Sequence, residues 1–221
     1  MDNGILVPND SNSSEAITMT NANSSKRIIL ASASPRRKDI LESMGAKFEI
    51  LVADADESSD ITDPELLTRE LARRKAQAAL DILTERGEAE GAIIIAADTI
   101  VACEGKVLGK PCDRDDAIAM IKLISDKAHV VASGIAVCTG GVIKTDCSIT
   151  KVIVDEIPDE EIIKYVDSGE PYDKAGGYGI QGSFSRWVSG IEGCYFGVVG
   201  LPANKLSRLF LECVGVYPDN I

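Results

Sequence analysis

Short apolar runs alternate with helix-like segments from residue 27 onward, and this alternation constrains the fold more than any other feature of the chain. The first four elements that the pattern predicts are strands at 27–32 and 47–53 and helices at 35–44 and 63–83. The order strand, helix, strand, helix is typical of a sheet whose faces are covered by helices.

A longer apolar run at residues 92–103 is rich in β-branched side chains and predicts another strand. Glu104 and Gly105 follow it and predict a hairpin turn. The remaining expected elements are strands at 106–108, 130–138 and 142–154 and helices at 113–125, 158–166 and 201–214. Because helices alternate with strands while hairpins also occur, we expect an α/β fold with a mixed, twisted sheet flanked by helices.

Length and charge limit the class of protein. A chain of 221 residues can bury a core without disulfides, as one domain or two closely joined lobes. Residues 1–25 are rich in Ser, Thr and Asn and are expected to form a disordered tail before a domain at 26–221. The net charge of -12 argues against long nucleic acid, whose affinity comes mostly from Lys and Arg. No apolar run approaches the roughly 20 residues of a membrane span, so no membrane partner is expected.

The six cysteines are scattered, and His129 is the only histidine. Without a C-x-x-C pair or a second histidine, a zinc site is not expected. Several cysteines lie in apolar surroundings that suit reduced, structural thiols, which indicates a cytoplasmic location. His129 is expected to be structural.

The segment from Ser32 to Arg37 follows a strand and opens a helix, which is the arrangement of many anion sites. Ser34 can cap the helix, and Pro35 suits its first position. Two guanidinium groups, those of Arg36 and Arg37, add forked donors that match phosphate oxygens. The alternative is an exposed, well-capped helix start with surface arginines.

Three charged residues are further candidates for the site: two of them interrupt apolar patterns, and the third lies in an acidic stretch. Asp98 interrupts an apolar strand, so it either lies at the exposed end, meets a cation such as Mg²⁺, or is bonded to backbone amides in a loop. Lys75 interrupts the apolar stripe of its helix, so it either extends to the surface or reaches a phosphate. Glu57 lies in an acidic stretch and is either a second metal ligand or part of a solvated loop.

Residues 173–182 form a glycine-rich segment. It contains a formal G-x-G-x-x-G pattern, but no strand precedes it, which argues against a dinucleotide site. Its glycines let the backbone pass close to a ligand, and Gln181 can form paired hydrogen bonds to the edge of a base. Trp187, at the rim of this segment, either stacks on a base or belongs to the core.

Together these segments resemble the Maf family of nucleotide pyrophosphatases, from about residue 27 to residue 214. The likeness rests on six motifs in chain order: Leu30-Ala31-Ser32-Ala33-Ser34-Pro35-Arg36-Arg37, Ala97-Asp98-Thr99, Leu108-Gly109-Lys110-Pro111, Asp173-Lys174-Ala175-Gly176, Tyr178-Gly179-Ile180-Gln181-Gly182 and Val199-Gly200-Leu201-Pro202. Two residues depart from the family pattern. Asp126 and Ser133 stand where members often have Gly and Thr, and we expect both to lie away from the site.

The resemblance implies two lobes around a central cleft and the hydrolysis of a nucleoside triphosphate to monophosphate and pyrophosphate with a divalent cation, Mg²⁺ or Mn²⁺. Carried over by matching position, Asp98 is the proton acceptor that activates water. Asp98 and Glu57 together are the metal ligands. The same matching gives the substrate-binding residues Ser34, Arg36, Arg37, Lys75, Thr99, Lys110 and Gln181.

Arg36, Thr99 and Gln181 match the Maf branch that acts on dTTP and UTP. The branch that acts on modified guanine nucleotides usually has Glu in place of Gln181. A Gln amide donates and accepts, which suits uracil or thymine, so pyrimidine nucleotides are the expected substrates. Two alternatives stay open: a pyrophosphatase of the inosine-triphosphate type, and a nucleotide-binding regulator of cell division without turnover. The small-molecule nucleotide is the expected partner, and a homodimer is an open alternative.

Overall fold

The computed structural model of the protein describes residues 26–221, so the tail predicted at 1–25 lies outside the described residues. A 7-stranded sheet has the order β2-β1-β3-β5-β6-β7, with β4 paired to β3. The strands are β1 Arg27–Leu30, β2 Phe48–Ile50, β3 Ala92–Cys103, β4 Lys106–Leu108, β5 Lys127–Thr139, β6 Val142–Val154 and β7 Val188–Glu192. Strand β1 is parallel to β2 and β3, and the other pairs are antiparallel, which confirms the mixed sheet.

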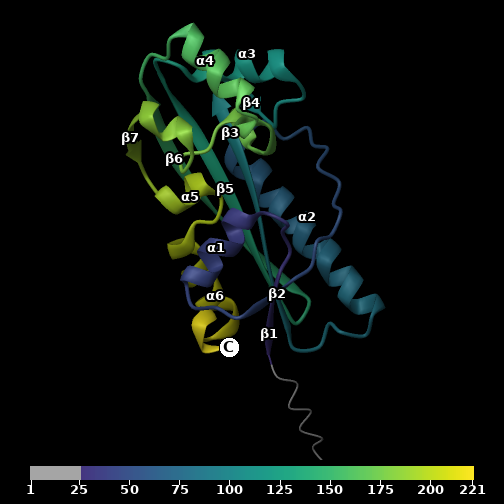
Figure 1. The fold of residues 1–221 in the computed structure, drawn as a ribbon. Coiled ribbons are helices and arrows are strands. Elements are labelled where there is room, and N and C mark those ends of the chain that lie inside the picture. The colour runs from purple at the N-terminus through teal and green to yellow at the C-terminus, as the bar shows by residue number, and fades with distance from the viewer. Residues whose placement is uncertain (1–25) are drawn as a thin grey trace, which may run out of the picture.

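Helices cover both faces of this sheet (Figure 1). The α-helices are α1 Pro35–Ser43, α2 Pro64–Glu85, α3 Arg114–Ile124, α4 Asp159–Asp167, α5 Tyr195–Val199 and α6 Ala203–Val214. The short 3-10 helices are η1 Glu170–Asp173, η2 Ala175–Gly177, η3 Ser183–Trp187 and η4 Pro218–Asn220. Helix α2 runs along one face, α1 and α6 lie on the other, and α3 and α4 stand at the end far from β1 (Figure 1).

Every strand and helix predicted from the sequence is present; the ends of β3, β4 and β6 are as predicted, and the other predicted elements have at least one shifted end. Asp63 caps α2 by accepting a hydrogen bond from the backbone N–H of Leu66 at 2.8 Å. The hairpin turn after β3 is confirmed, because Glu104 and Gly105 have φ angles of 50° and 76°. Asp126, where the family often has Gly, also has a positive φ of 55°. Strand β7 and helix α5 were not predicted.

Strand β3 sends alternate side chains to the two faces of the sheet. Ile93 and Ile95 pack into the core under α1 and α6, whereas Ile94 packs into the core under α2. The same alternation directs Asp98 toward α2 and Thr99 toward α1. The period of the strand therefore sets which helix each of these two polar side chains meets.

Helix α2 lies unusually close to the sheet at Gly134, which pairs with Asp98 across the β3–β5 ladder. A Cβ added at Gly134 would lie 2.2 Å from the carbonyl oxygen of Thr68 on α2. Only glycine permits this approach. The close packing of α2 on the sheet places the side chains of α2 near Asp98.

A second core lies beyond Asp98, around α3, α4 and the aromatic side chains of Tyr165, Tyr178, Phe184 and Trp187. Trp187 is 8% exposed and belongs to this core. His129 is buried, and its Nε2 lies 2.7 Å from the Oη atom of Tyr178, which agrees with a structural role. Separate cores at the two ends of the long strands form the two lobes.

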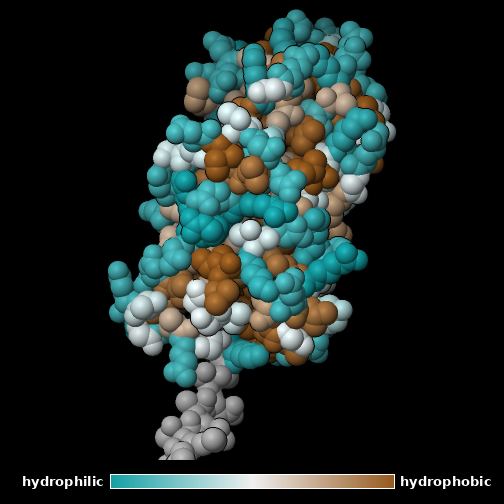
Figure 2. Space-filling model, turned by 180° about the vertical axis from the view of Figure 1, so that it is seen from behind, coloured by the Kyte–Doolittle hydropathy of each residue, from teal (hydrophilic) through white to brown (hydrophobic). Residues whose placement is uncertain are grey.

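The surface combines hydrophilic side chains with separate apolar patches, as the face in Figure 2 shows. Within residues 26–221, no helix combines the length and the apolar character that a membrane crossing requires.

Candidate active site

A cleft of about 520 Å³ opens where the two lobes meet, a size typical of small-molecule sites. Its lining includes every residue that the sequence predicted for the site: Ser34, Arg36, Arg37, Glu57, Lys75, Asp98, Thr99, Lys110 and Gln181. Segments that are far apart in the sequence thus come together at one place.

Lys75 joins the two carboxylates that were expected to hold a metal. Its Nζ atom lies 2.5 Å from Oδ1 of Asp98 and 2.8 Å from Oε1 of Glu57. Lys75 follows Leu71 by one helical turn on the face of α2 that packs against the sheet, so its side chain points toward β3. The side chains of Lys75 and Asp98 are only 19% and 11% exposed. Asp98 therefore meets a cation, as one of the sequence alternatives required, and this cation is the protein's own ammonium group.

The carboxylates of Asp98 and Glu57 both contact Nζ of Lys75, and carboxylate oxygens are ligands that suit a hard divalent cation. Glu57 is well exposed, and its hydrogen bond from Lys75 lowers the pKa of the Glu57 carboxyl below its ordinary value. No group of three or more His, Cys, Asp or Glu side chains arranged for a metal occurs in the described part of the chain. Mg²⁺ commonly takes one or two carboxylates and completes its shell with water and substrate phosphates. Asp98 and Glu57 fit that donor set.

Arg37 is fixed by three hydrogen bonds at the start of α1. Its Nε donates to the carbonyl oxygen of Gly200 at 2.9 Å, Nη1 to Oγ of Ser32 at 3.2 Å, and Nη2 to Oγ1 of Thr99 at 3.2 Å. These bonds hold the guanidinium group at the cleft wall. The alternative of a freely exposed surface arginine is therefore wrong for this residue.

Ser133 corrects the sequence prediction, because it was expected to lie away from the site. Its Oγ lies 2.8 Å from Oγ1 of Thr99 and also donates to the carbonyl oxygen of Gly197 at 2.7 Å. Ser133 and Thr99 face each other across β3 and β5. The substitution for the common Thr thus touches a site residue directly.

Ser34 occupies the N-cap position of α1, but its side chain makes no capping hydrogen bond. Oγ of Ser32 instead accepts a hydrogen bond from the backbone N–H of Ser34 at 3.2 Å. The prediction that the Ser34 side chain caps the helix was therefore wrong.

Arg36, with a 28% exposed side chain, pairs its Nη1 with Oδ2 of Asp173 at 2.9 Å.

Lys110 and Gln181 line the cleft and are exposed. Neither side chain forms a hydrogen bond or an ion pair with another of residues 26–221. Both polar groups are thus available to a ligand.

The sequence assigned no individual role to three residues beside the cleft: Glu170, Asp173 and Lys174. The Nζ atom of Lys174 donates to Oδ1 of Asp173 and to the carbonyl oxygen of Glu170, both at 2.6 Å. Burial alone raises the pKa of Asp173, but hydrogen bonds from Lys174 and Arg36 outweigh that effect and lower the pKa to about 2. The Asp173-Lys174 motif was the only sign of this pair in the sequence.

Residues 27–213 match the family model described as Maf-like protein. The chain belongs to the Maf family. It is 44% identical over 178 residues to the dTTP/UTP pyrophosphatase of Caldanaerobacter subterraneus subsp. tengcongensis, covering 80% of this chain and 84% of that relative. It is 43% identical over 173 residues to the dTTP/UTP pyrophosphatase of Chromobacterium violaceum, covering 78% of this chain and 87% of that relative. Each alignment thus covers more than three quarters of this Maf protein and of the relative.

Proposed function

We propose that this Maf protein hydrolyses dTTP and UTP to the nucleoside monophosphate and pyrophosphate with a divalent cation, Mg²⁺ or Mn²⁺. One observation carries the proposal: a nearly buried carboxylate, that of Asp98, lies in a cleft of suitable volume that several cationic side chains also line. The relatives are dTTP/UTP pyrophosphatases, and this supplies the choice of substrate.

The cations of the cleft bind the triphosphate. The guanidinium groups of Arg36 and Arg37 offer forked N–H donors, and Lys110 offers a mobile ammonium group. The hydroxyl of Ser34 adds a neutral donor at the start of α1. Because Arg37 is already held by three hydrogen bonds, little of its conformational freedom is lost when phosphate binds.

Asp98 accepts a proton from the water that attacks the α-phosphorus, and pyrophosphate leaves. Before the nucleotide binds, Lys75 fixes the position of this carboxylate, and its ammonium group stands on the cleft wall within reach of a phosphate oxygen. Asp98 and Glu57 would hold a divalent cation, and that cation would supply charge neutralisation on the triphosphate. The contribution of the other residues is positioning and charge stabilisation.

The base lies toward Gln181. The Gln181 amide is exposed on the cleft and both donates and accepts hydrogen bonds, which matches the edge of uracil or thymine.

The enzyme acts in the cytoplasm, where its six cysteines, all free, stay reduced.

The test is a panel of canonical and modified nucleoside triphosphates with Mg²⁺ or Mn²⁺, scored for pyrophosphate and orthophosphate separately. The proposal predicts pyrophosphate from dTTP and UTP at higher kcat/KM than from ITP. A preference for ITP supports the inosine-triphosphate type, whereas tight nucleotide binding without product supports the non-hydrolytic regulator. Orthophosphate as the first product contradicts the assigned bond.

A further inference from the structure

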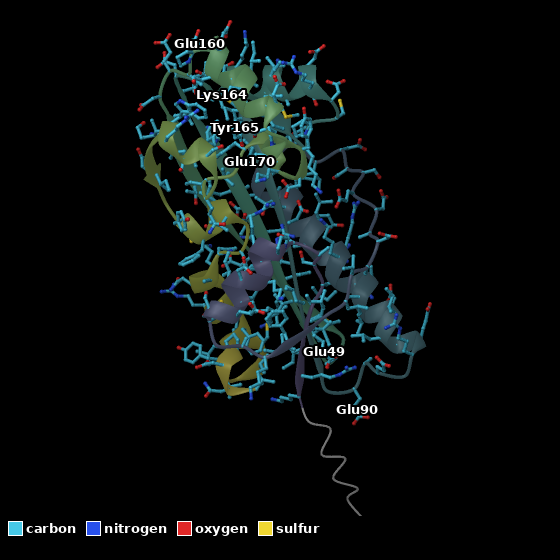
Figure 3. All side chains as sticks on the ribbon, viewed as in Figure 1. Glu49, Glu90, Glu160, Lys164, Tyr165 and Glu170 are labelled. Atoms are coloured by element: carbon cyan, nitrogen blue, oxygen red, sulfur yellow. The ribbon has the colours of Figure 1, made fainter. Side chains whose placement is uncertain are left out.

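The loop that carries Gln181 is attached to the rest of its lobe through the carboxylate of Glu170. Oε2 of Glu170 accepts hydrogen bonds from the backbone N–H of Ser183 at 3.1 Å and from its Oγ at 2.7 Å. Oε1 accepts a hydrogen bond from Oη of Tyr165 at 3.3 Å. Figure 3 shows Tyr165 and Glu170 near each other, on α4 and on the segment that follows it. A single carboxylate thus links the loop to α4.

The backbone of this loop presses directly against Glu170 and its neighbour. A Cβ added at Gly182 would lie 1.9 Å from Oε1 of Glu170, and one added at Gly179 would lie 2.7 Å from Cε of Lys174. Contacts this close exist only because both positions are glycine. Gln181 lies between these two glycines, so its backbone is held on both sides.

Tyr165, which donates the hydrogen bond to Glu170, is itself held firmly in the core. It is 3% exposed, and its ring packs against Phe184 and Trp187 at centroid distances of 5.4 and 5.9 Å. Burial raises the pKa of Tyr165, so its hydroxyl remains a hydrogen-bond donor over the physiological range.

Further hydrogen bonds connect Glu170 to Arg36, one of the residues proposed to bind phosphate. Lys174 donates to the carbonyl oxygen of Glu170 and to Asp173, and Asp173 accepts a hydrogen bond from Arg36. The loop that carries Gln181 is therefore placed relative to α1 as well as to α4.

We infer that Glu170 is a positioning residue for base recognition, holding residues 179–183 so that Gln181 faces the cleft. Glu170 acts through Gln181 and does not itself touch the nucleotide. The inference rests on the proposed function, because it assigns the base to Gln181. It extends that function to a residue that lies outside the cleft lining.

The test measures how much the base adds to affinity, as the ratio of the dissociation constants of ribose 5-phosphate and UMP. Gln181→Ala should lower this ratio about tenfold, as expected for lost hydrogen bonds of the amide. Glu170→Ala should lower it by a comparable factor while leaving the affinity for ribose 5-phosphate within about twofold. In the double variant, Glu170→Ala should add almost nothing, because its effect requires Gln181.

Two further variants separate positioning from general stability. Glu170→Gln keeps a carbonyl oxygen that can accept from Ser183 and should restore most of the ratio. Glu212→Ala, which removes an exposed ion pair with Lys144, is the matched control and should leave the ratio unchanged. Should Glu170→Ala fail to fold, Ser183→Ala replaces it in the cycle, because it removes only the 2.7 Å bond.

Additive effects of Glu170→Ala and Gln181→Ala, or an unchanged ratio in a folded Glu170 variant, overturn the inference. A wild-type protein that binds UMP no better than ribose 5-phosphate also overturns it. The binding measurement needs no turnover, so it is separate from the proposed function. A wild-type protein that prefers UMP but releases no pyrophosphate from UTP contradicts the proposed function alone.

Discussion

Replacing Lys75 with Met isolates the ion pair at the centre of the site. Met keeps most of the length and apolar surface of the lysine but leaves Asp98 without its cation. A hydrogen bond between charged groups contributes about 1.5–3 kcal/mol. The Lys75–Asp98 pair is mostly buried, whereas the 64% exposed Glu57 adds little. Lys75→Met should therefore lower the free energy of unfolding by about 2 kcal/mol, which lowers Tm by about 4–8 °C in a domain of this size.

Asp98→Asn is the second arm of the cycle and should cost less, about 1 kcal/mol, because Lys75 retains Glu57 as a partner. Urea unfolding of wild type, both single variants and the double variant measures the coupling. The double variant should be destabilised by about 1 kcal/mol less than the sum of the single variants. Additivity within about 0.5 kcal/mol would refute the conclusion that this pair stabilises the cleft.

Three other perturbations test the surroundings of the site. Mg²⁺ should raise the Tm of Lys75→Met more than that of wild type, because an ammonium group no longer stands between the carboxylates; equal shifts contradict this. Gly134→Ala should cost about 1–3 kcal/mol and reduce turnover, because the added methyl pushes α2 and Lys75 from Asp98; a variant with wild-type stability and rate argues otherwise. Burial lowers the pKa of His129 from 6.5 to about 4, so the unfolded chain takes up a proton first as pH falls. As pH falls from 6.5 to 4, wild type should therefore lose about 3 kcal/mol more of its free energy of unfolding than His129→Phe does; equal losses in both proteins would count against a buried, neutral His129.

The long elements could be predicted from sequence because their signals are strong. The β-branched run of β3 and the capped start of α2 define their elements locally. Strand β7 was missed because its five residues include Ser189 and Gly190, and it forms through pairing with β6. Helix α5 is equally short. For such segments tertiary contacts decide the structure, and periodicity carries too little information.

The composition of the site was predictable, but its connections were not. Asp98 and Lys75 were each conspicuous as charges within apolar stretches. That they meet depends on the approach of α2 to the sheet at Gly134, which is a property of the packed fold. Ser133 was placed away from the site because nothing local shows that strand β5 brings it beside Thr99.

The central claim is that water attacks the α-phosphorus of a pyrimidine nucleoside triphosphate in this cleft, with Asp98 as the proton acceptor. Hydrolysis of UTP in ¹⁸O-labelled water, followed by mass spectrometry of both products, tests it most directly. The mechanism predicts one labelled oxygen in UMP, none in pyrophosphate, and nearly complete loss of both products in a folded Asp98→Asn variant. Label in pyrophosphate, or undiminished turnover in Asp98→Asn, would contradict it.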